Sequence, residues 1–213
     1  MEKKPKKKIR SAKNKTDPFN HIINTALDLA EKRGWQGLLL NNIAEEAGLT
    51  LAELSKHFSS KTAILNGFQK RTNDAVLCSG IADGSSCRDQ LFGILMHRFD
   101  ILEPYRNSIR LIIRDVARDP FTALMQGPQI YSSMALMLEA VGVVTTGIEG
   151  ALRVKGLILI YARALRIWLY DDSADFSETM SALDRDLTRA ESMAGMLNKS
   201  HVIKKSPTDN NPI

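Results

Sequence analysis

The stretch that decides the fold is "IAEEAGLTLAELSKHFSSK", residues 43–61, in which two short apolar runs lie on either side of Gly48. Glycine allows a sharp turn between two helices, and Thr50 is placed to cap the second one. Small residues before the turn and large apolar residues after it let two short helices cross steeply, which leaves the outer face of the second helix exposed. The pattern predicts a helix-turn-helix whose inner side chains are Ile43, Ala44, Ala47, Leu49, Leu54, His57 and Phe58.

An acidic residue, Glu53, lies in the second of these helices, where a DNA-reading helix usually carries hydrogen-bond donors. Thr50 and Glu53 have the spacing of a capping box, in which the carboxylate turns back to the Thr50 amide. The alternative is that the carboxylate reads cytosine. We favour the capping box, because it explains the acidic residue without any contact to DNA.

Helix signals extend along nearly the whole chain, and strand signals are nearly absent. An Asp-Pro pair at 17–18 begins a first helix, and Gly34 ends it. Two prolines and a glycine in "ARDPFTALMQGP", residues 117–128, predict a break, and Asp175 with Glu178 predicts a capping box at the last helix. The expected helices span about 17–33, 41–47, 51–58, 59–77, 87–102, 104–118, 129–144, 148–170 and 174–197.

The clearest internal boundary is the Gly/Ser-rich loop around residues 78–87. The expected fold is therefore all-α, with an N-terminal helix-turn-helix domain and a C-terminal helical domain for ligand binding and dimerisation. The expected organisation is a disordered basic arm at 1–16, a helix-turn-helix domain at 17–77, a helical domain at 86–197 and a flexible tail at 198–213.

The net charge of +5 resides in the first fifteen residues, which hold eight Lys/Arg and one Glu, whereas the remaining 198 residues hold 21 Lys/Arg and 23 Asp/Glu. Such an arm suits the phosphates of nucleic acid or an anionic membrane surface, and a solubilising tail is the simpler alternative. No run approaches the ~20 apolar residues of a membrane span, and no apolar stretch of a secretory signal follows the lysines. A cytoplasmic protein is expected.

Two cysteines, Cys78 and Cys87, are too few for a disulfide scaffold. They flank the Gly/Ser-rich loop, so a redox switch is conceivable, but two unpaired thiols are the simpler interpretation. The four histidines lack metal-ligand spacing, and the chain contains neither a phosphate-binding loop nor a nucleophile elbow. We expect no enzymatic activity, no metal site and no cofactor.

The last predicted helix has apolar residues spaced alternately four and three apart from Phe176 to Leu197, which is a heptad seam. The helix before it, at 148–170, is apolar over most of its circumference and must be covered on several sides. A two-fold homodimer that pairs both helices with their copies would cover it, and the alternative is coverage by residues 87–144 of the same chain. The expected dimer interface consists of Leu157, Ile160, Trp168, Phe176, Met180, Leu183 and Leu187.

The helix-turn-helix stretch resembles the TetR family of transcriptional repressors, whose pattern runs Ile-Ala, Ala-Gly, Leu-Thr, an aliphatic residue, His-Phe and Ser-Lys. The likeness covers about 60 residues, including a first helix in the family's position. Two departures are Ser55, where the family usually has tyrosine, and Leu39, where it often has threonine. The resemblance implies that the residues facing the DNA groove or its phosphates are Thr50, Leu51, Ala52, Ser55, Lys56, His57 and Lys61.

The C-terminal half is similar to a narrower group, the TetR-fold lipid-binding accessory proteins of ubiquinone biosynthesis, in "ILEPYRNSIRLIIRDVARDP" and "YARALRIWLYDDSADFSETMSALDRDL". Two functions are implied. One is a dimeric one-component regulator, a repressor that binds a near-palindromic operator in double-stranded DNA and is released by a small apolar effector. The alternative is a lipid- or isoprenoid-binding protein that no longer reads DNA.

An effector pocket is expected among the helices between residues 87 and 170, because methionines and aromatic residues gather there. Such side chains make an adaptable apolar wall, although core packing explains any single one of them equally well. The effector itself is expected to be small and apolar or lipid-like. The candidate lining residues are Phe99, Phe121, Met125, Tyr131, Met134, Met137, Tyr161 and Trp168.

Overall fold

The structure is a computed structural model that describes residues 17–80 and 86–203. Within these ranges every regular element is a helix, which confirms the expected all-α fold. None of these helices is long and apolar enough to cross a membrane. The elements are α1 (Pro18–Arg33), α2 (Leu40–Glu46), α3 (Leu51–Ser55), α4 (Lys61–Cys78), α5 (Cys87–Leu102), the 3-10 turn η1 (Glu103–Tyr105), α6 (Arg106–Val116), α7 (Pro120–Ala140), α8 (Gly147–Trp168) and α9 (Ser177–Ile203).

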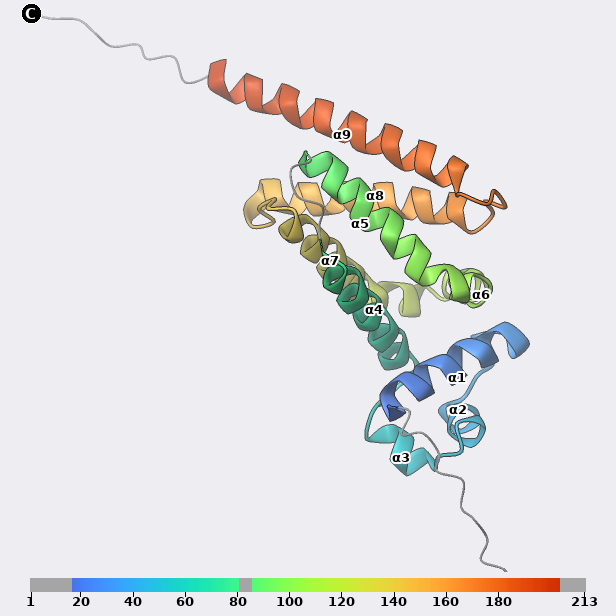
Figure 1. The fold of residues 1–213 in the computed structure, drawn as a ribbon. Helices are drawn as coiled ribbons and strands as arrows, with labels where there is room; N and C mark the ends of the chain where they lie inside the picture. The colour runs from blue at the N-terminus through green and yellow to red at the C-terminus, as the bar shows by residue number, and fades with distance from the viewer. Residues whose placement is uncertain (1–16, 81–85, 204–213) are drawn as a thin grey trace, which may run out of the picture.

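The first three helices form a small head at one end of the molecule, and α8 and α9 lie at the opposite end (Figure 1). Helix α4 begins at the head and continues into the body, where it packs against α5 and α7 as well as α1. The head and the body therefore share one helix. The expected basic arm at 1–16 and most of the expected tail lie outside the described residues, although α9 extends past the predicted end at 197.

The head is held together by an apolar face of α1 that packs against α2 and α4. Asp17 caps α1 by accepting a hydrogen bond from the Phe19 amide, as the sequence predicts. The ring of Phe58, just after α3, lies 4.8 Å from the ring of Phe19. A Cβ atom at Gly67 would lie 2.7 Å from Phe58 Cε1, so only glycine lets this ring rest directly on α4.

Helix α7 corrects one prediction from the sequence. The expected break at 117–128 is confined to residues 117–119, and one helix runs from Pro120 to Ala140 with Pro128 inside it. An internal proline costs about 3 kcal/mol because it removes a hydrogen bond to the residue four positions earlier. That residue is Leu124, which is exposed, so its free carbonyl can bond to water. Burial of α7 beyond the proline, at Met134 and Met137, offsets the remaining cost.

The start of α9 corrects a second prediction. The helix begins at Ser177 and is capped by Asp171 rather than by the expected Asp175–Glu178 pair. The buried carboxylate of Asp171 accepts hydrogen bonds from the amide and the hydroxyl of Thr179, at 2.9 and 2.7 Å. The amide and hydroxyl of Ser173 donate to its other oxygen. One buried carboxylate thus orders both the α8–α9 turn and the first turn of α9.

Burial alone would raise the pKa of Asp171, but the hydrogen bonds from Ser173 and Thr179 outweigh it and lower the pKa below its ordinary 3.8. A lowered pKa means that this carboxylate stabilises the fold fully above about pH 4, and that the contribution is lost as the pH falls through the lower, folded value. We expect Asp171→Asn to reduce the free energy of unfolding by about 2–3 kcal/mol at pH 7 in urea denaturation. The difference from the wild type should shrink towards pH 3.

The matched control is Asp175→Asn, because Asp175 is exposed and precedes the helix. Its effect should stay within about 0.5 kcal/mol. Equal losses for the two variants would show that Asp171 is not the cap.

Candidate nucleic-acid interface

The turn between α2 and α3 has the geometry that the sequence predicts. Gly48 adopts a φ of 68°, and the amide of Leu49 donates to the carbonyl of Ala44 at 2.8 Å. The turn is fixed to α1, because His21 Nε2 lies 3.2 Å from the carbonyl oxygen of Ala47. The inner side chain of α3, Leu54, is fully buried, and α3 is therefore held firmly on the head.

Glu53 forms the predicted capping box. Its Oε2 accepts hydrogen bonds from the amide and the hydroxyl of Thr50, both at 2.8 Å, while the Glu53 amide donates to Thr50 Oγ1 at 3.2 Å. The hydrogen bonds from Thr50 hold the pKa of Glu53 below its ordinary value, so the carboxylate is charged at neutral pH. Both side chains are therefore occupied in starting α3, and Thr50 has less to offer a phosphate than expected.

The outer face of α3 is exposed, as a reading surface requires. Leu51, Ala52, Ser55 and Lys56 are all exposed on it. His57, which the sequence pattern assigned to the inner side, is exposed as well. The hydroxyl of Ser55 donates to the Ala52 carbonyl at 2.9 Å, within the helix itself. The face thus presents small and apolar side chains with one cation.

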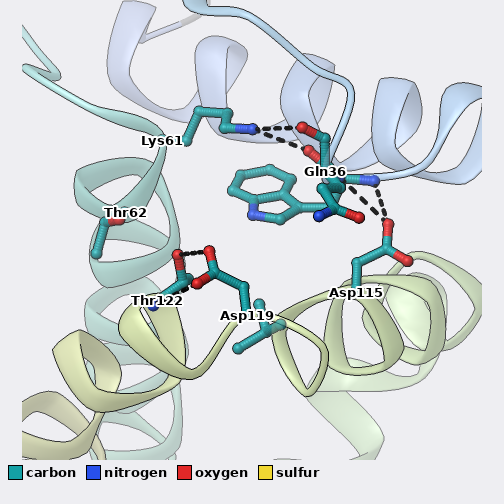
Figure 2. Close-up of a pocket in the computed structure, with 8 residues that line it drawn as sticks. Gln36, Lys61, Thr62, Asp115, Asp119 and Thr122 are labelled. Atoms are coloured by element: carbon teal, nitrogen blue, oxygen red, sulfur yellow. Dashed lines mark hydrogen bonds between the residues drawn. The ribbon is translucent and has the colours of Figure 1, made fainter.

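Lys61 lies at the start of α4, where its side chain bonds to the α1–α2 loop, and its expected phosphate contact stays a prediction. Its Nζ donates hydrogen bonds to the carbonyl oxygens of Trp35 and Gln36, at 3.0 and 3.2 Å (Figure 2). It also lies 5.5 Å from the centroid of the Trp35 ring. Desolvation lowers the pKa of Lys61, although the carboxylates of Asp115 and Asp119 act in the opposite direction. Lys61 therefore anchors the α1–α2 loop.

The same loop is held from its other side by Asp115, near the end of α6. Its Oδ2 accepts hydrogen bonds from the amides of Trp35 and Gln36, at 2.8 and 3.3 Å (Figure 2). Burial alone would raise the pKa of Asp115, but these two hydrogen bonds and the charge of Arg114 outweigh it and lower the pKa. A cavity of about 120 Å³ lies beside this joint. No local sequence signal reveals it, because Asp115 is about 80 residues from the loop.

The charge of the head is opposite to what DNA attracts. Residues 17–60 contain three Lys/Arg and six Asp/Glu. Glu45 and Glu46 are exposed on α2, next to the α3 surface with its single Lys56. The basic arm that would offset these acidic residues lies outside the described residues.

Residues 22–67 match the sequence model of the family described as bacterial regulatory proteins, tetR family. The matched segment covers most of α1, all of α2 and α3, and the start of α4. The N-terminal part of the chain thus contains a tetR-family domain. The family is one of regulators rather than enzymes, and a search of curated proteins found no match.

Solved structures of TetR-family regulators share the fold over most of the chain. A TetR transcriptional regulator from Nitrosomonas europaea is 20% identical, with a TM-score of 0.66 over 81% of this chain and 97% of that one. One from Rhodococcus is 16% identical, with a TM-score of 0.59 over 80% and 93%. The fatty acid degradation regulator FadR from Bacillus halodurans is 16% identical, with a TM-score of 0.54 over 82% and 96%. The chain thus shares the fold of these structures.

The residues expected to line an effector pocket differ in burial: some lie in the interior of the body, and others are exposed or half-buried. Phe99 stacks on Tyr161 and Trp168, with ring centroids 5.6 and 5.4 Å apart, and all three are buried in the body. Met134 and Met137 are buried as well, whereas Met125 is exposed, Tyr131 is half-buried and the Phe121 side chain lies outside the described residues. A cavity of about 280 Å³ lies elsewhere, between α4 and α5, and Val76, Gly93, Ile94 and His97 are among its lining residues.

The residues expected at the dimer interface are mostly buried within the chain. Four of them are buried where α8 and α9 pack on each other and on α5: Leu157, Trp168, Leu183 and Leu187. Their place at a dimer interface stays a prediction. Within the part of α9 whose side chains are described, Leu183 and Leu187 of the heptad seam pack inside the subunit, whereas Ala190 is exposed. Of the expected set, the half-buried residues are Ile160, Phe176 and Met180.

Replacing Lys61 with methionine tests its anchoring role. We expect Lys61→Met to lower the free energy of unfolding by about 1–2 kcal/mol in urea denaturation, because two loop carbonyls lose their donor. Lys70→Met is the matched control, since Lys70 is exposed on the same helix and should change stability by less than about 0.5 kcal/mol. A Lys61 effect no larger than that of Lys70 would contradict the role.

Proposed function

We propose that this protein is a TetR-like one-component transcriptional repressor that binds a near-palindromic operator as a homodimer. The observation that carries the proposal is the exposed outer face of α3, which is capped by Thr50 and Glu53 and held on the head by buried Leu54. A helix supported in this way can enter the major groove of DNA. Leu51, Ala52 and Ser55 would face the bases, and Lys56 and His57 the phosphates.

The basic arm supplies the attraction that the head lacks. With six acidic and three basic residues at 17–60, the head alone would be repelled by the phosphate backbone. Eight cations in residues 1–15 outweigh this repulsion and would follow the backbone or an adjacent minor groove. Most of the affinity would then come from the arm, and the position on the DNA from α3.

An exposed apolar stripe on α8 supports dimerisation. Ile148, Leu152 and Leu159 are 84%, 63% and 71% exposed, and they lie on one side of the helix at i, i+4 and i+11. Exposed aliphatic side chains in a row favour burial against a second copy, and a two-fold axis would bring α8 and α9 of both subunits into a four-helix bundle. The proposed interface thus lies on the outer side of α8.

Release from DNA would follow from an effector in the body. The body and the head share α4, and α6 contacts the α1–α2 loop through Asp115. An effector that binds one arrangement of these helices more tightly shifts the separation of the two heads away from the spacing of the operator.

The alternative is a lipid- or isoprenoid-binding protein of the ubiquinone-biosynthesis type that no longer reads DNA. Two observations favour it: the acidic head, and Ser55 at a position where the family usually carries tyrosine. Selection of DNA from a random pool at about 150 mM salt separates the two functions. A regulator should enrich a palindrome, whereas weak binding to every sequence would support the lipid carrier.

The salt dependence of binding to the selected site tests the proposed contacts. We expect deletion of residues 1–15 to reduce the slope of log K against log salt by several units, because each phosphate contact contributes about 0.9. Lys56→Ala should reduce the slope by about 1. Fluorescence anisotropy at several salt concentrations measures both. Lys70→Ala is the control. If deletion of residues 1–15 leaves the slope unchanged, the arm does not contact the DNA.

Charge introduced into the α8 stripe should separate the subunits. We expect the double variant Leu152→Asp, Leu159→Asp to be a folded monomer in light scattering, because each aspartate would be buried without a partner in the dimer. Leu124→Asp is the matched control, since Leu124 is 68% exposed on α7, away from the stripe, and should leave the dimer intact. If the double variant stays dimeric, the interface lies elsewhere.

A further inference from the structure

The body contains a buried arginine on which four helices converge. Arg98 of α5 is only 4% exposed. Its Nε donates to the hydroxyl of Tyr161 on α8 at 3.1 Å, and its Nη1 donates to Oδ1 of Asn73 on α4 at 2.5 Å. Ser133 of α7 donates to the same Asn73 oxygen at 2.7 Å. The guanidinium also lies 5.4 Å from the centroid of the Tyr161 ring.

All of these partners are neutral. Among the described residues, no carboxylate forms an ion pair with Arg98. Two arginines nearer the surface do form ion pairs with carboxylates: Arg88 pairs with Asp184, and Arg106 pairs with Glu103 at 2.8 Å. A buried cation without an anion is costly, because an arginine cannot give up its proton and its lost hydration is replaced only by dipoles. The structure thus retains a positive charge in its interior that nothing in the described chain neutralises.

A cavity lies close to this charge. The cavity of about 280 Å³ between α4 and α5 is lined by Val76 and Ile94, among others. Ile94 lies one helical turn before Arg98 on α5, and Val76 lies one turn after Asn73 on α4. One side of the cavity therefore lies about one helical turn from the Arg98–Asn73 pair. Val76 and Ile94 are apolar, whereas the lining also includes polar residues: Ser79, Asp89, Gln90 and His97. The ring of Phe99, next to Arg98 in the chain, stacks on Tyr161.

We propose that Arg98 binds the acidic group of an amphipathic effector, an organic acid with a single carboxylate and an apolar body. One guanidinium neutralises one carboxylate, and its planar donors match the two oxygens of that group. The apolar body lies along the cavity between α4 and α5. This inference rests on the proposed function for the role of the acid as an effector, but the binding itself can be measured without DNA.

Thermal unfolding of the full chain with hexanoate, decanoate and benzoate, each compared with its alcohol, tests the head group. At about a hundred times its Kd, a recognised acid should raise Tm by about 5 °C or more, and its alcohol by clearly less. Arg98→Gln should abolish the difference between acid and alcohol. If no acid raises Tm more than its alcohol, the proposal is overturned.

A second variant keeps the test decisive even if Arg98→Gln does not fold. Asn73→Asp has the shape of the natural side chain but places a carboxylate 2.5 Å from Arg98 Nη1. It should raise Tm in the absence of ligand and weaken binding of the acid at least tenfold, because the internal anion takes the place of the external one. Loss of stability together with unchanged binding of the acid would overturn the proposal.

Asn66→Asp is the control on the same helix; Asn66 is half-buried, and its Oδ1 atom is buried without a partner. It has no arginine to pair with, so it should lower Tm and leave binding of the acid unchanged. The outcome is independent of DNA selection. If the acid binds through Arg98 but DNA selection finds no operator, the proposed regulator function is wrong and the acid site stands. If selection finds an operator but no acid binds, only the inference about Arg98 is wrong.

Discussion

The buried carboxylate of Asp115 fixes the position of the head on the body. It accepts hydrogen bonds from the amides of Trp35 and Gln36, while Lys61 donates hydrogen bonds to the carbonyls of the same two residues. The α1–α2 loop is therefore held between a negative and a positive side chain, each bonded to the backbone groups that suit its charge. Gly34 completes the joint, because a Cβ atom there would lie 3.3 Å from Asp115 Oδ2 and its φ of 77° disfavours other residues. Helices α1, α4 and α6 meet at this one point.

Helix α4 connects that joint to the buried arginine. Lys61 and Asn73 are twelve residues apart on it, which corresponds to about 18 Å along the helix axis. Two residues of α4 between these positions, Asn66 and Gln69, each have a buried polar side-chain atom without a partner. Gln126 on α7 has one as well. Two helices in tight apolar contact resist sliding past each other, because any shift opens voids between their side chains. Unpaired amides break no hydrogen bond when they move. Helices α4 and α7, which pack on each other, thus both carry unpaired amides of this kind.

The sequence predicts well what depends on neighbours along the chain and poorly what depends on distant residues. The Gly48 turn and the Thr50–Glu53 capping box could be predicted because their partners are at most four or five residues apart. The role of Lys61 could not, because its acceptors are about 25 residues away and the carboxylate behind them is on α6. The heptad spacing in α9 was real but ambiguous, since the same spacing serves packing inside a subunit or between two. Pro128 misled because a proline is tolerated when the carbonyl it frees faces solvent.

The small side chains on α3 determine what kind of recognition the proposed regulator can perform. Leu51 and Ala52 have no hydrogen-bonding groups, and the Ser55 hydroxyl already donates within the helix. These three side chains can contact thymine methyl groups and accept a single hydrogen bond. They cannot form the bidentate contacts that distinguish guanine or adenine. Sequence preference would then come largely from the shape and deformability of the operator, and from the minor groove if the arm enters it. In the proposed regulator, a head with few base contacts and an acidic surface would depend for its affinity on the arm, which holds eight Lys/Arg in the first fifteen residues.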